Sequence, residues 1–384
     1  MAERKRIALN YQTNYDFSAG IVIYIQNLIK GFALLDDSLQ PSLLIIHSEN
    51  SPIDEIKALN YKYISFYCHK PIEPSFPVKV INKISRELSG RNFIRRHEFP
   101  GEDILLYPFV DCPETFHFKK RLYWKPDFQE MYFPDFVSEA ELNYVKEVLN
   151  NTRKHPEYTL VFSSEDSLND FKKFFSPFSN LVSVLRFVSI IPTLPATSAD
   201  EIRQKYSLPE KYFFVANQFW PHKNHKLVLQ ALATVKKHYP NCCIAFSGKQ
   251  SSYRDGDYFS NLQKFIAENS LEENVKFLGF IPRTDQLLLM KYAQAVIQPS
   301  LFEGWSTVIE DCKALGQFVI ASDLAVNIEQ SDRNILFFPR NEESKLAEGI
   351  QQVLENKISR NPYDYSLNIK QFTKDLVRVF SLEQ

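Results

Sequence analysis

The chain has 384 residues, of which 44% are hydrophobic and 24% charged, a composition ordinary for a soluble globular protein. This length suggests two or three domains, each with a core of its own. The net charge of −1 and the isoelectric point near 6.7 argue against a nucleic-acid binder, which would usually carry a clear excess of basic residues.

The location of the protein is indicated by its cysteines and its apolar runs. The five cysteines show no Cys-x-x-Cys spacing, which indicates reduced thiols in a cytosol-like compartment. No segment resembles a signal peptide or approaches the roughly 18–20 apolar residues of a membrane span. Residues 83–96 and 117–125 combine basic and aromatic side chains. The favoured interpretation of both stretches is that they form solvated faces of helices and loops. The alternative is a cytoplasmic protein whose N-terminal domain makes peripheral contact with the inner face of the cell membrane.

Short apolar runs alternate with amphipathic segments along the chain, the pattern of a parallel sheet covered by helices on both faces. The predicted strands of the first half are residues 6–11, 42–47, 63–67, 104–109, 122–125, 159–163 and 182–186. The predicted helices of the first half are residues 20–35, 80–96, 139–149 and 167–174.

The second half repeats the pattern. Its predicted strands are residues 212–216, 242–246, 275–278, 295–298, 318–321 and 335–338. Its predicted helices are residues 224–238, 258–269, 284–292, 307–315, 343–355 and 364–380.

A segment with Pro192, Pro195 and several small residues separates the two series and reads as a linker over residues 188–199. We therefore expect an N-terminal domain over residues 1–187 and a C-terminal domain over 200–362, with a final helix in 363–384 packing back. Two βα domains joined by one linker would form a cleft, the usual place for a ligand.

Residues 299–316 carry the most informative chemistry. Glu303 and Glu310 lie on either side of a helix start led by Gly304, directly after a predicted strand. Such a helix start offers backbone N–H groups and a positive dipole end, which suit a phosphate. Carboxylates suit the hydroxyls of a sugar or ribose. The segment therefore predicts a nucleotide-sugar site. A capping box with Thr307 at the N-cap and Glu310 three residues later is a structural alternative for Glu310, and both roles can coexist.

A second cluster, residues 217–225, follows the strand predicted at 212–216. Asn224 is a predicted N-cap, and His222, Lys223 and His225 gather at the helix start. Cations are unfavourable there because of the helix dipole, and a bound anion would remove the conflict. We predict that Lys223 faces a diphosphate.

Other motifs are weaker. Residues 17–20, ending in Gly20, form a predicted loop before the first helix. Residues 123–130 place aromatic side chains around Asp127 and Glu130, which suits either a sugar ring or buried packing. Residues 163–165 suggest an N-cap. No metal site is predicted, because the histidines lack metal-ligand spacing and Asp255-Gly256-Asp257 is more typical of a turn.

Taken together, these motifs resemble glycosyltransferase family 4, retaining enzymes of the α/β GT-B fold, in which two Rossmann-like domains face each other across a cleft. The resemblance is strongest over residues 211–330. Residues 302–310 resemble the two-glutamate motif of the family, and the stretch ending at Phe280 resembles the part that lines the base. The family usually spaces the glutamates by seven residues, whereas six intervene here. Gln218 stands where an Arg is usual, and Glu130 where a His is often found.

The resemblance implies roles for individual residues. Glu310 would bind the ribose and Glu303 the hydroxyls of the donor sugar. Negative charge on the departing diphosphate would be stabilised by Lys223, Gln218 and the backbone N–H groups of Gly304, Trp305, Ser306 and Thr307. Gly20 and Asp127 would position the acceptor. The catalytic candidates are Glu303, Lys223 and Asp127.

The implied function is a retaining hexosyltransferase that needs no metal or cofactor. It would move a sugar from a UDP- or GDP-sugar to a glycan or lipid-linked acceptor, in a context of bacterial surface polysaccharide synthesis. The alternatives are a sugar-nucleotide epimerase or hydrolase on the same fold, and a non-catalytic glycan-binding protein.

Overall fold

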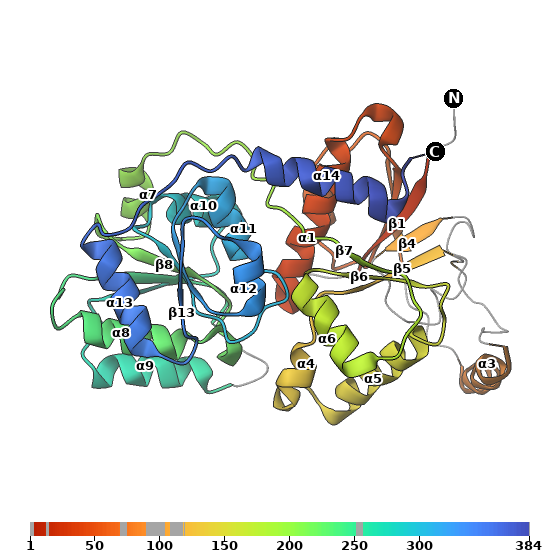
Figure 1. Cartoon of the computed structure of the whole chain (residues 1–384), viewed down its shortest axis with the longest axis horizontal. Coiled ribbons are helices and arrows are strands. Elements are labelled where there is room, and N and C mark those ends of the chain that lie inside the picture. Colours follow the sequence, from red (N-terminus) through yellow and green to blue (C-terminus); the bar gives the residue numbers. More distant parts are fainter. Residues whose placement is uncertain are drawn as a thin grey trace. The chain divides into compact units, whose positions relative to one another are not determined.

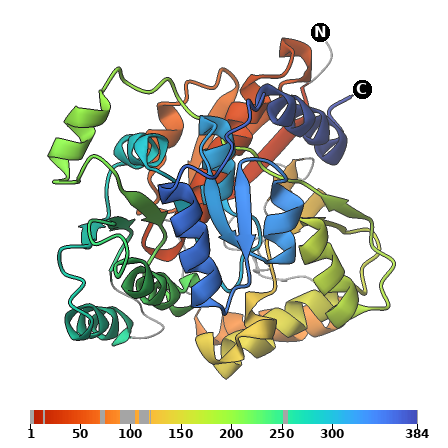
Figure 2. The ribbon, with the colours of Figure 1, turned by 60° about the vertical axis from the view of Figure 1, so that its left-hand side comes forward.

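The computed structural model describes residues 4–12, 15–69, 75–89, 104–107, 118, 120–250 and 256–383, and Figures 1 and 2 show it as a ribbon. Two compact units can be distinguished by their internal contacts. Unit 1 comprises Met1–Pro126, Ala140–Val188 and Leu367–Gln384. Unit 2 comprises Asp127–Glu139 and Ser189–Ser366.

Unit 1 contains a parallel sheet, which has seven strands within the described residues. Its strand order is β3-β2-β1-β4-β5-β6-β7. The strands are β1 (Arg6–Tyr11), β2 (Ser42–His47), β3 (Ile64–Cys68), β4 (Leu105–Tyr107), β5 (Lys120–Lys125), β6 (Thr159–Phe162) and β7 (Val182–Val184). The order reverses between β1 and β4, as in a Rossmann fold.

Unit 2 contains a second parallel sheet, with six described strands in the order β10-β9-β8-β11-β12-β13. The strands are β8 (Phe213–Ala216), β9 (Ile244–Ser247), β10 (Val275–Gly279), β11 (Val296–Gln298), β12 (Val319–Ser322) and β13 (Ile335–Phe338). Successive strand residues point to opposite faces. Phe213 and Val215 therefore enter one apolar core, whereas Phe214 and Ala216 enter the other. Both faces are covered, so the apolar runs are continuous.

Helices connect the strands in both units (Figure 1). Those assigned to unit 1 are α1 (Tyr15–Ala33), η1 (Asp37–Leu39), α2 (Ile53–Lys57), α3 (Phe76–Ser89), α5 (Glu139–Thr152), α6 (Glu165–Phe175) and α14 (Ser366–Phe380). Those of unit 2 are α4 (Gln129–Tyr132), η3 (Pro134–Phe136), α7 (Ala199–Lys205), η4 (Pro221–Lys223), α8 (His225–Val235), α9 (Tyr258–Glu268), α10 (Arg283–Tyr292), α11 (Thr307–Leu315), α12 (Ala325–Gln330) and α13 (Glu343–Leu354). Among the described helices, none is long and apolar enough to span a bilayer.

Helix α14 packs against α1 within unit 1. Phe380 lies edge-on to Phe32 of α1 at 5.3 Å between ring centroids. A Cβ built on Gly31 would come within 2.7 Å of the Phe372 ring and 2.8 Å of the Leu376 side chain. The close approach of the two helices therefore depends on a glycine at this position of α1.

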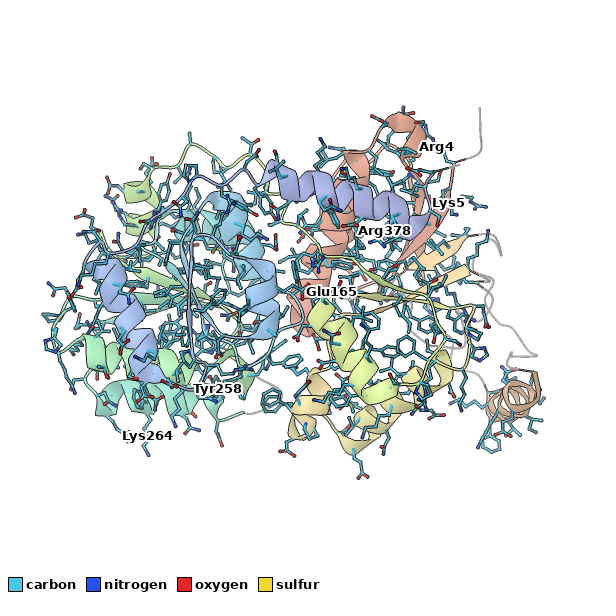
Figure 3. All side chains as sticks on the ribbon, in the orientation of Figure 1. Arg4, Lys5, Glu165, Tyr258, Lys264 and Arg378 are labelled. Carbon is cyan, nitrogen blue, oxygen red and sulfur yellow. The ribbon has the colours of Figure 1, made fainter. Side chains whose placement is uncertain are left out.

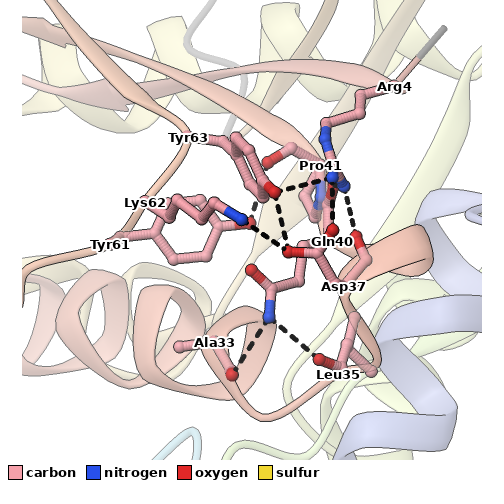
Figure 4. Close-up of polar contacts among 9 residues, drawn as sticks. All are labelled: Arg4, Ala33, Leu35, Asp37, Gln40, Pro41, Tyr61, Lys62 and Tyr63. Carbon is pink, nitrogen blue, oxygen red and sulfur yellow. Dashed lines mark hydrogen bonds and ion pairs between the residues drawn. The ribbon is translucent and has the colours of Figure 1, made fainter. Parts of the chain in front are cut away.

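A polar cluster fastens the start of β1 to the turn before β2 (Figure 4). The Arg4 guanidinium donates to Oδ2 of Asp37 at 2.6 Å and to the Tyr63 hydroxyl at 2.7 Å, and it stacks over the Tyr63 ring. The Tyr63 hydroxyl and Lys62 donate to the other carboxylate oxygen of Asp37. The Tyr63 hydrogen bond, followed by that of Arg4, holds the pKa of Asp37 well below its usual value.

The predicted α/β pattern is confirmed, and each predicted strand is present with its ends within two residues of the expected bounds. Residues 90–96 and 108–109, at the ends of two predicted elements, lie outside the described residues. The first helix begins at Tyr15, so the loop predicted at 17–20 is wrong and Gly20 lies within α1. The short helices α2, α4, α7 and α12 were missed, because one or two turns are too short to show a helical period.

Candidate functional site

The candidate residues of unit 2 gather at one edge of its sheet. The order of the strands reverses between β8 and β11, which are paired neighbours. Loops 217–224 and 299–306 follow the carboxyl ends of these two strands. In open parallel sheets, ligands bind outside the carboxyl ends of the strands at such a switch point. Lys223 lies on the first loop and Glu303 on the second.

Lys223 and Glu303 form an ion pair across the switch point. Nζ of Lys223 lies 2.7 Å from Oε1 of Glu303, and their side chains are only 15% and 10% exposed. The same Oε1 accepts a hydrogen bond from Nε2 of Gln298 at 2.7 Å, and Oε1 of Gln298 accepts one from Asn217 at 3.0 Å. The last residue of β11 and the first residue after β8 therefore hold Glu303 in place.

Backbone contacts join the two loops. The N–H of Leu301 donates to the carbonyl of His222 at 2.7 Å. The Asn224 side chain donates to the Pro299 carbonyl at 3.3 Å. Because each loop is anchored to the other, the positions of Lys223 and Glu303 are fixed by contacts within unit 2.

Gln218 reaches a third loop, after β9. Its Oε1 accepts the backbone N–H of Lys249 at 2.9 Å, which leaves the N–H₂ of its amide as a donor. Gly248 permits this approach: it has a φ of +152°, and a Cβ there would lie 2.1 Å from the Asn217 carbonyl oxygen. Only glycine fits such a conformation at such a distance.

The segment before α5 packs on the same loops. Phe133 lies edge-on to Phe302 at 6.2 Å between ring centroids, and Phe136 lies 6.0 Å from His222. Asp127, which begins this segment, accepts the N–H of Gln129 at 3.0 Å. Aromatic packing, one of the two interpretations of the 123–130 stretch, is also present at Trp124, whose ring stacks on Tyr24 in unit 1.

The histidines of the β8 loop differ from the expectation. Asn224 occupies the N-cap position of α8, but its side chain makes no cap hydrogen bond. His225 is buried and stacks on Phe219 at 4.4 Å, and its backbone N–H donates to the hydroxyl of Tyr258, labelled in Figure 3. Burial lowers the pKa of His225 from 6.5 to about 3. The predicted cluster of three cations is therefore wrong as regards His225, which is neutral near pH 7.

The N-terminus of α11 is capped one residue earlier than predicted. Ser306 is the N-cap, and its hydroxyl accepts the N–H of Ile309 at 3.3 Å. The expected Thr307–Glu310 capping box is wrong, since Thr307 is already the first residue of the helix. The backbone N–H of Ser306 donates to the side chain of Gln330 at 3.0 Å, so it is already in use.

Glu310 lies in a buried polar network. It is 1% exposed, and Oε1 accepts from Lys313 at 2.7 Å and from Gln330 at 3.0 Å. Oε2 accepts from the Tyr365 hydroxyl at 2.5 Å. The Tyr365 hydroxyl in turn accepts the backbone N–H of Ser189 at 2.7 Å. The Glu310 carboxylate thus ties α11 to the two segments of unit 2 that adjoin unit 1 in sequence.

Asp311 is a residue that sequence reasoning missed. It is buried, accepts from Arg283 at 2.5 Å and is hydrogen-bonded by the Ser189 hydroxyl. Seven residues lie between Glu303 and Asp311. This is the usual spacing of the two glutamates in the family that the sequence resembles, and it could have pointed to Asp311. Gln298 and Gln330 were also missed, because a single amide within or beside an apolar element carries no pattern.

Three further predicted site residues are Phe280, Trp305 and Gly20. Phe280 follows β10, two strands from β8, and is 60% exposed. Trp305 is buried beside the α11 cap. Gly20 lies on α1 of unit 1, with no atom within 4 Å of a Cβ built there. Within the described part of the chain, no three acidic, His or Cys side chains are placed to hold a metal ion.

Similar proteins were found both by sequence and by fold. The O-antigen chain mannosyltransferase RfbU of Salmonella typhimurium is 25% identical over 237 residues, which is 61% of each chain. Anabaena HepE, crystallised with UDP and glucose, has a TM-score of 0.67 at 17% identity over 98% of this chain and 95% of its own. Sucrose-phosphate synthase of Thermosynechococcus elongatus has a TM-score of 0.64 at 14% identity, covering 99% and 97%.

These structural neighbours have the two-sheet GT-B fold, so the predicted fold class is confirmed. The family model named Glycosyl transferases group 1 matches residues 198–367, which include the loops of Lys223 and Glu303. Residues 198–367 are therefore similar to this family, and the match covers less than half of the chain.

Proposed function

We propose that the protein is a glycosyltransferase that moves a sugar from a nucleoside-diphosphate sugar to a glycan acceptor. The observation that carries the proposal is the Lys223–Glu303 pair at the switch point of a parallel sheet, within the region that matches the glycosyl transferases group 1 model. A cation for the diphosphate and a carboxylate for the sugar are side by side there.

Lys223 and Gln218 would stabilise the leaving diphosphate. An ammonium group has three donors, so Lys223 can keep its bond to Glu303 and still donate to phosphate oxygens. The Gln218 amide is oriented by Lys249 and directs its own N–H₂ donors away from that bond. Donors fixed in advance stabilise the charge that develops in the transition state. In this proposal they do so without a metal ion.

Glu303 would bind the donor sugar. Its bonds to Lys223 and Gln298 both go to Oε1, and none of the described residues hydrogen-bonds Oε2. Oε2 is therefore the oxygen that we assign to a sugar hydroxyl. The backbone of Gly304, Trp305 and Thr307 at the start of α11 completes the proposed phosphate side.

The nucleoside would lie toward β10, where Phe280 offers an exposed ring to the base. The assignment of Glu310 to the ribose stays a prediction, and its bonds to Lys313, Gln330 and Tyr365 favour a structural role. A UDP-sugar is the first donor to try, because HepE was crystallised with UDP.

The finer parts of the proposal concern the acceptor. We assign a retaining hexosyl transfer to a glycan or lipid-linked acceptor, in line with the O-antigen chain mannosyltransferase relative. The acceptor would be positioned by Asp127 and Gly20. The matches span 61% or less of the length of the curated relatives. Contact of the N-terminal domain with the inner membrane face is part of this proposal.

A panel of UDP-, GDP- and ADP-sugars, each with and without glycan acceptors, tests the function. We expect nucleotide release that requires an acceptor, and NMR of the product would show the donor's anomeric configuration. Release without an acceptor would indicate a hydrolase or epimerase instead. Binding of a nucleotide sugar without any turnover would indicate a non-catalytic protein.

A further inference from the structure

Helix α3 of unit 1 exposes its apolar face instead of burying it. Phe76, Val80 and Ile84 recur every four residues and therefore lie on one face of the helix. Phe76 is 79% exposed and Ile84 53%, and Val80 and the adjacent Ile81 are also exposed. An ordinary surface helix directs such a stripe into the core and its polar residues to solvent.

The buried side of the same helix is partly polar. Val78 and Asn82 are its buried residues, on the face roughly opposite Phe76 and Val80. An amide is thus turned inward while four large apolar side chains are turned outward. Contiguous apolar surface of this kind marks a site of interaction with a protein or a membrane.

The charge around this face distinguishes between these two partners. Lys79 and Lys83 are exposed and lie along one border of the apolar face at helical spacing. Within α3 the one acidic residue is Glu87. The basic residues of the helix are Lys79, Lys83 and Arg86. An apolar face bordered by lysines fits a bilayer with anionic lipids, in which the lysine ammonium groups reach the headgroups.

We infer that α3 is an interfacial helix that docks the protein onto an anionic lipid surface, with Phe76, Val80, Ile81 and Ile84 inserted among the acyl chains. This inference rests on the membrane contact proposed above and names the surface that makes it. It is independent of sugar transfer and can be tested without a donor or an acceptor.

Vesicle co-sedimentation of the full chain is the test. We expect binding to mixed phosphatidylglycerol and phosphatidylcholine vesicles, and little to phosphatidylcholine alone. Ile84→Ser should weaken binding roughly tenfold. Lys79→Gln and Lys83→Gln should each weaken it about fivefold. The control is Leu34→Ser, which removes a side chain of similar exposure (55%) elsewhere in unit 1 and should leave binding unchanged.

Ile84→Trp gives a direct readout, because a tryptophan inserted into the bilayer shifts its emission to the blue on addition of anionic vesicles. An unshifted emission with every vesicle, or equal weakening by Leu34→Ser, would overturn the inference. So would a dimer, detected without lipid, that Ile84→Ser dissociates, because the face would then serve a second copy. A lower melting temperature of Ile84→Ser would place the face within the protein core. Turnover of a short soluble acceptor tests the proposed transferase separately.

Discussion

Nζ of Lys223 lies 2.7 Å from Oε1 of Glu303, although 80 residues separate them in the sequence. Each residue follows one of the two strands between which the order of the unit 2 sheet reverses. The pairing gives the Glu303 carboxylate a compensating charge. In the proposed mechanism it would also hold Lys223 in place for an incoming diphosphate, so binding and catalysis would depend on the same two side chains.

Lys223→Ala should lower kcat/KM about 100- to 1000-fold, because it removes the proposed donor to the leaving diphosphate. The measurement is acceptor-dependent nucleotide release, with circular dichroism as the check on folding. Lys226→Ala, an exposed lysine of α8 nearby, is the matched control and should retain full activity. Near-normal turnover by a folded Lys223→Ala variant would contradict the assignment.

Tyr365→Phe should reduce the free energy of unfolding by about 3 kcal/mol. The change removes a hydrogen bond to the buried Glu310 carboxylate and leaves the Ser189 N–H without its acceptor. Tyr292→Phe, which removes a single bond to the Thr197 carbonyl, should cost about 1 kcal/mol and serves as the comparison. Urea unfolding measures both.

The same variant tests the ribose assignment. If Glu310 is structural, the Kd for UDP should stay within about twofold of the wild-type value, since no ligand contact is lost. Clearly tighter binding by Tyr365→Phe would show that the phenol and a ribose hydroxyl compete for Oε2 of Glu310.

The strands could be predicted from the sequence because both sheets are parallel and their central strands are largely buried, so most strands are mainly apolar runs. The placement of Glu303 and Lys223 on adjacent loops followed from the motifs. Their direct pairing did not, because side-chain partners depend on how the loops are anchored. The anchors, Gln298 and the His222 carbonyl, leave no trace in a sequence pattern.

The burial of individual polar residues was harder to predict. Because Ser306 and not Thr307 is the N-cap, Glu310 is the fourth residue of α11 and not at the third position that a capping box requires. His225 was predicted to be a cation. Its burial could not be predicted, because it depends on the stacking of Phe219, which lies in a loop of irregular conformation.

Stability should fall on acidification because His225 is neutral in the folded protein. Its pKa is about 3 in the folded protein, against 6.5 for a solvent-exposed histidine, so between these values the unfolded chain binds more protons. The contribution is present above pH 6.5 and is lost as the pH falls toward 3. Between about pH 7 and about pH 5 the loss should be about 2 kcal/mol. Urea unfolding of wild type and His225→Phe isolates it. An equal pH dependence in both proteins would refute the prediction.

Gly20→Ala separates stability from acceptor binding. Gly20 lies within α1, and no atom approaches a Cβ built there. An alanine should therefore stabilise the helix by about 0.5–1 kcal/mol. If Gly20 lets the acceptor approach the backbone, KM for the acceptor should rise while the melting temperature also rises. An unchanged KM would remove Gly20 from the proposed site.

Gly248→Ala should damage both folding and donor binding. The new Cβ would lie 2.1 Å from the Asn217 carbonyl oxygen, and the φ of +152° is itself strained for alanine, so the β8 and β9 loops must separate. We expect a loss of stability of about 2–3 kcal/mol or more. Because Gln218 follows Asn217 and is held by Lys249, the same separation should weaken UDP binding. Gly256→Ala is the control, since nothing lies within 4 Å of its Cβ. Isothermal titration with UDP and thermal unfolding are measured for both variants. Equal UDP affinities and equal melting temperatures of the two variants would show that the close contact between these loops is not needed for the site.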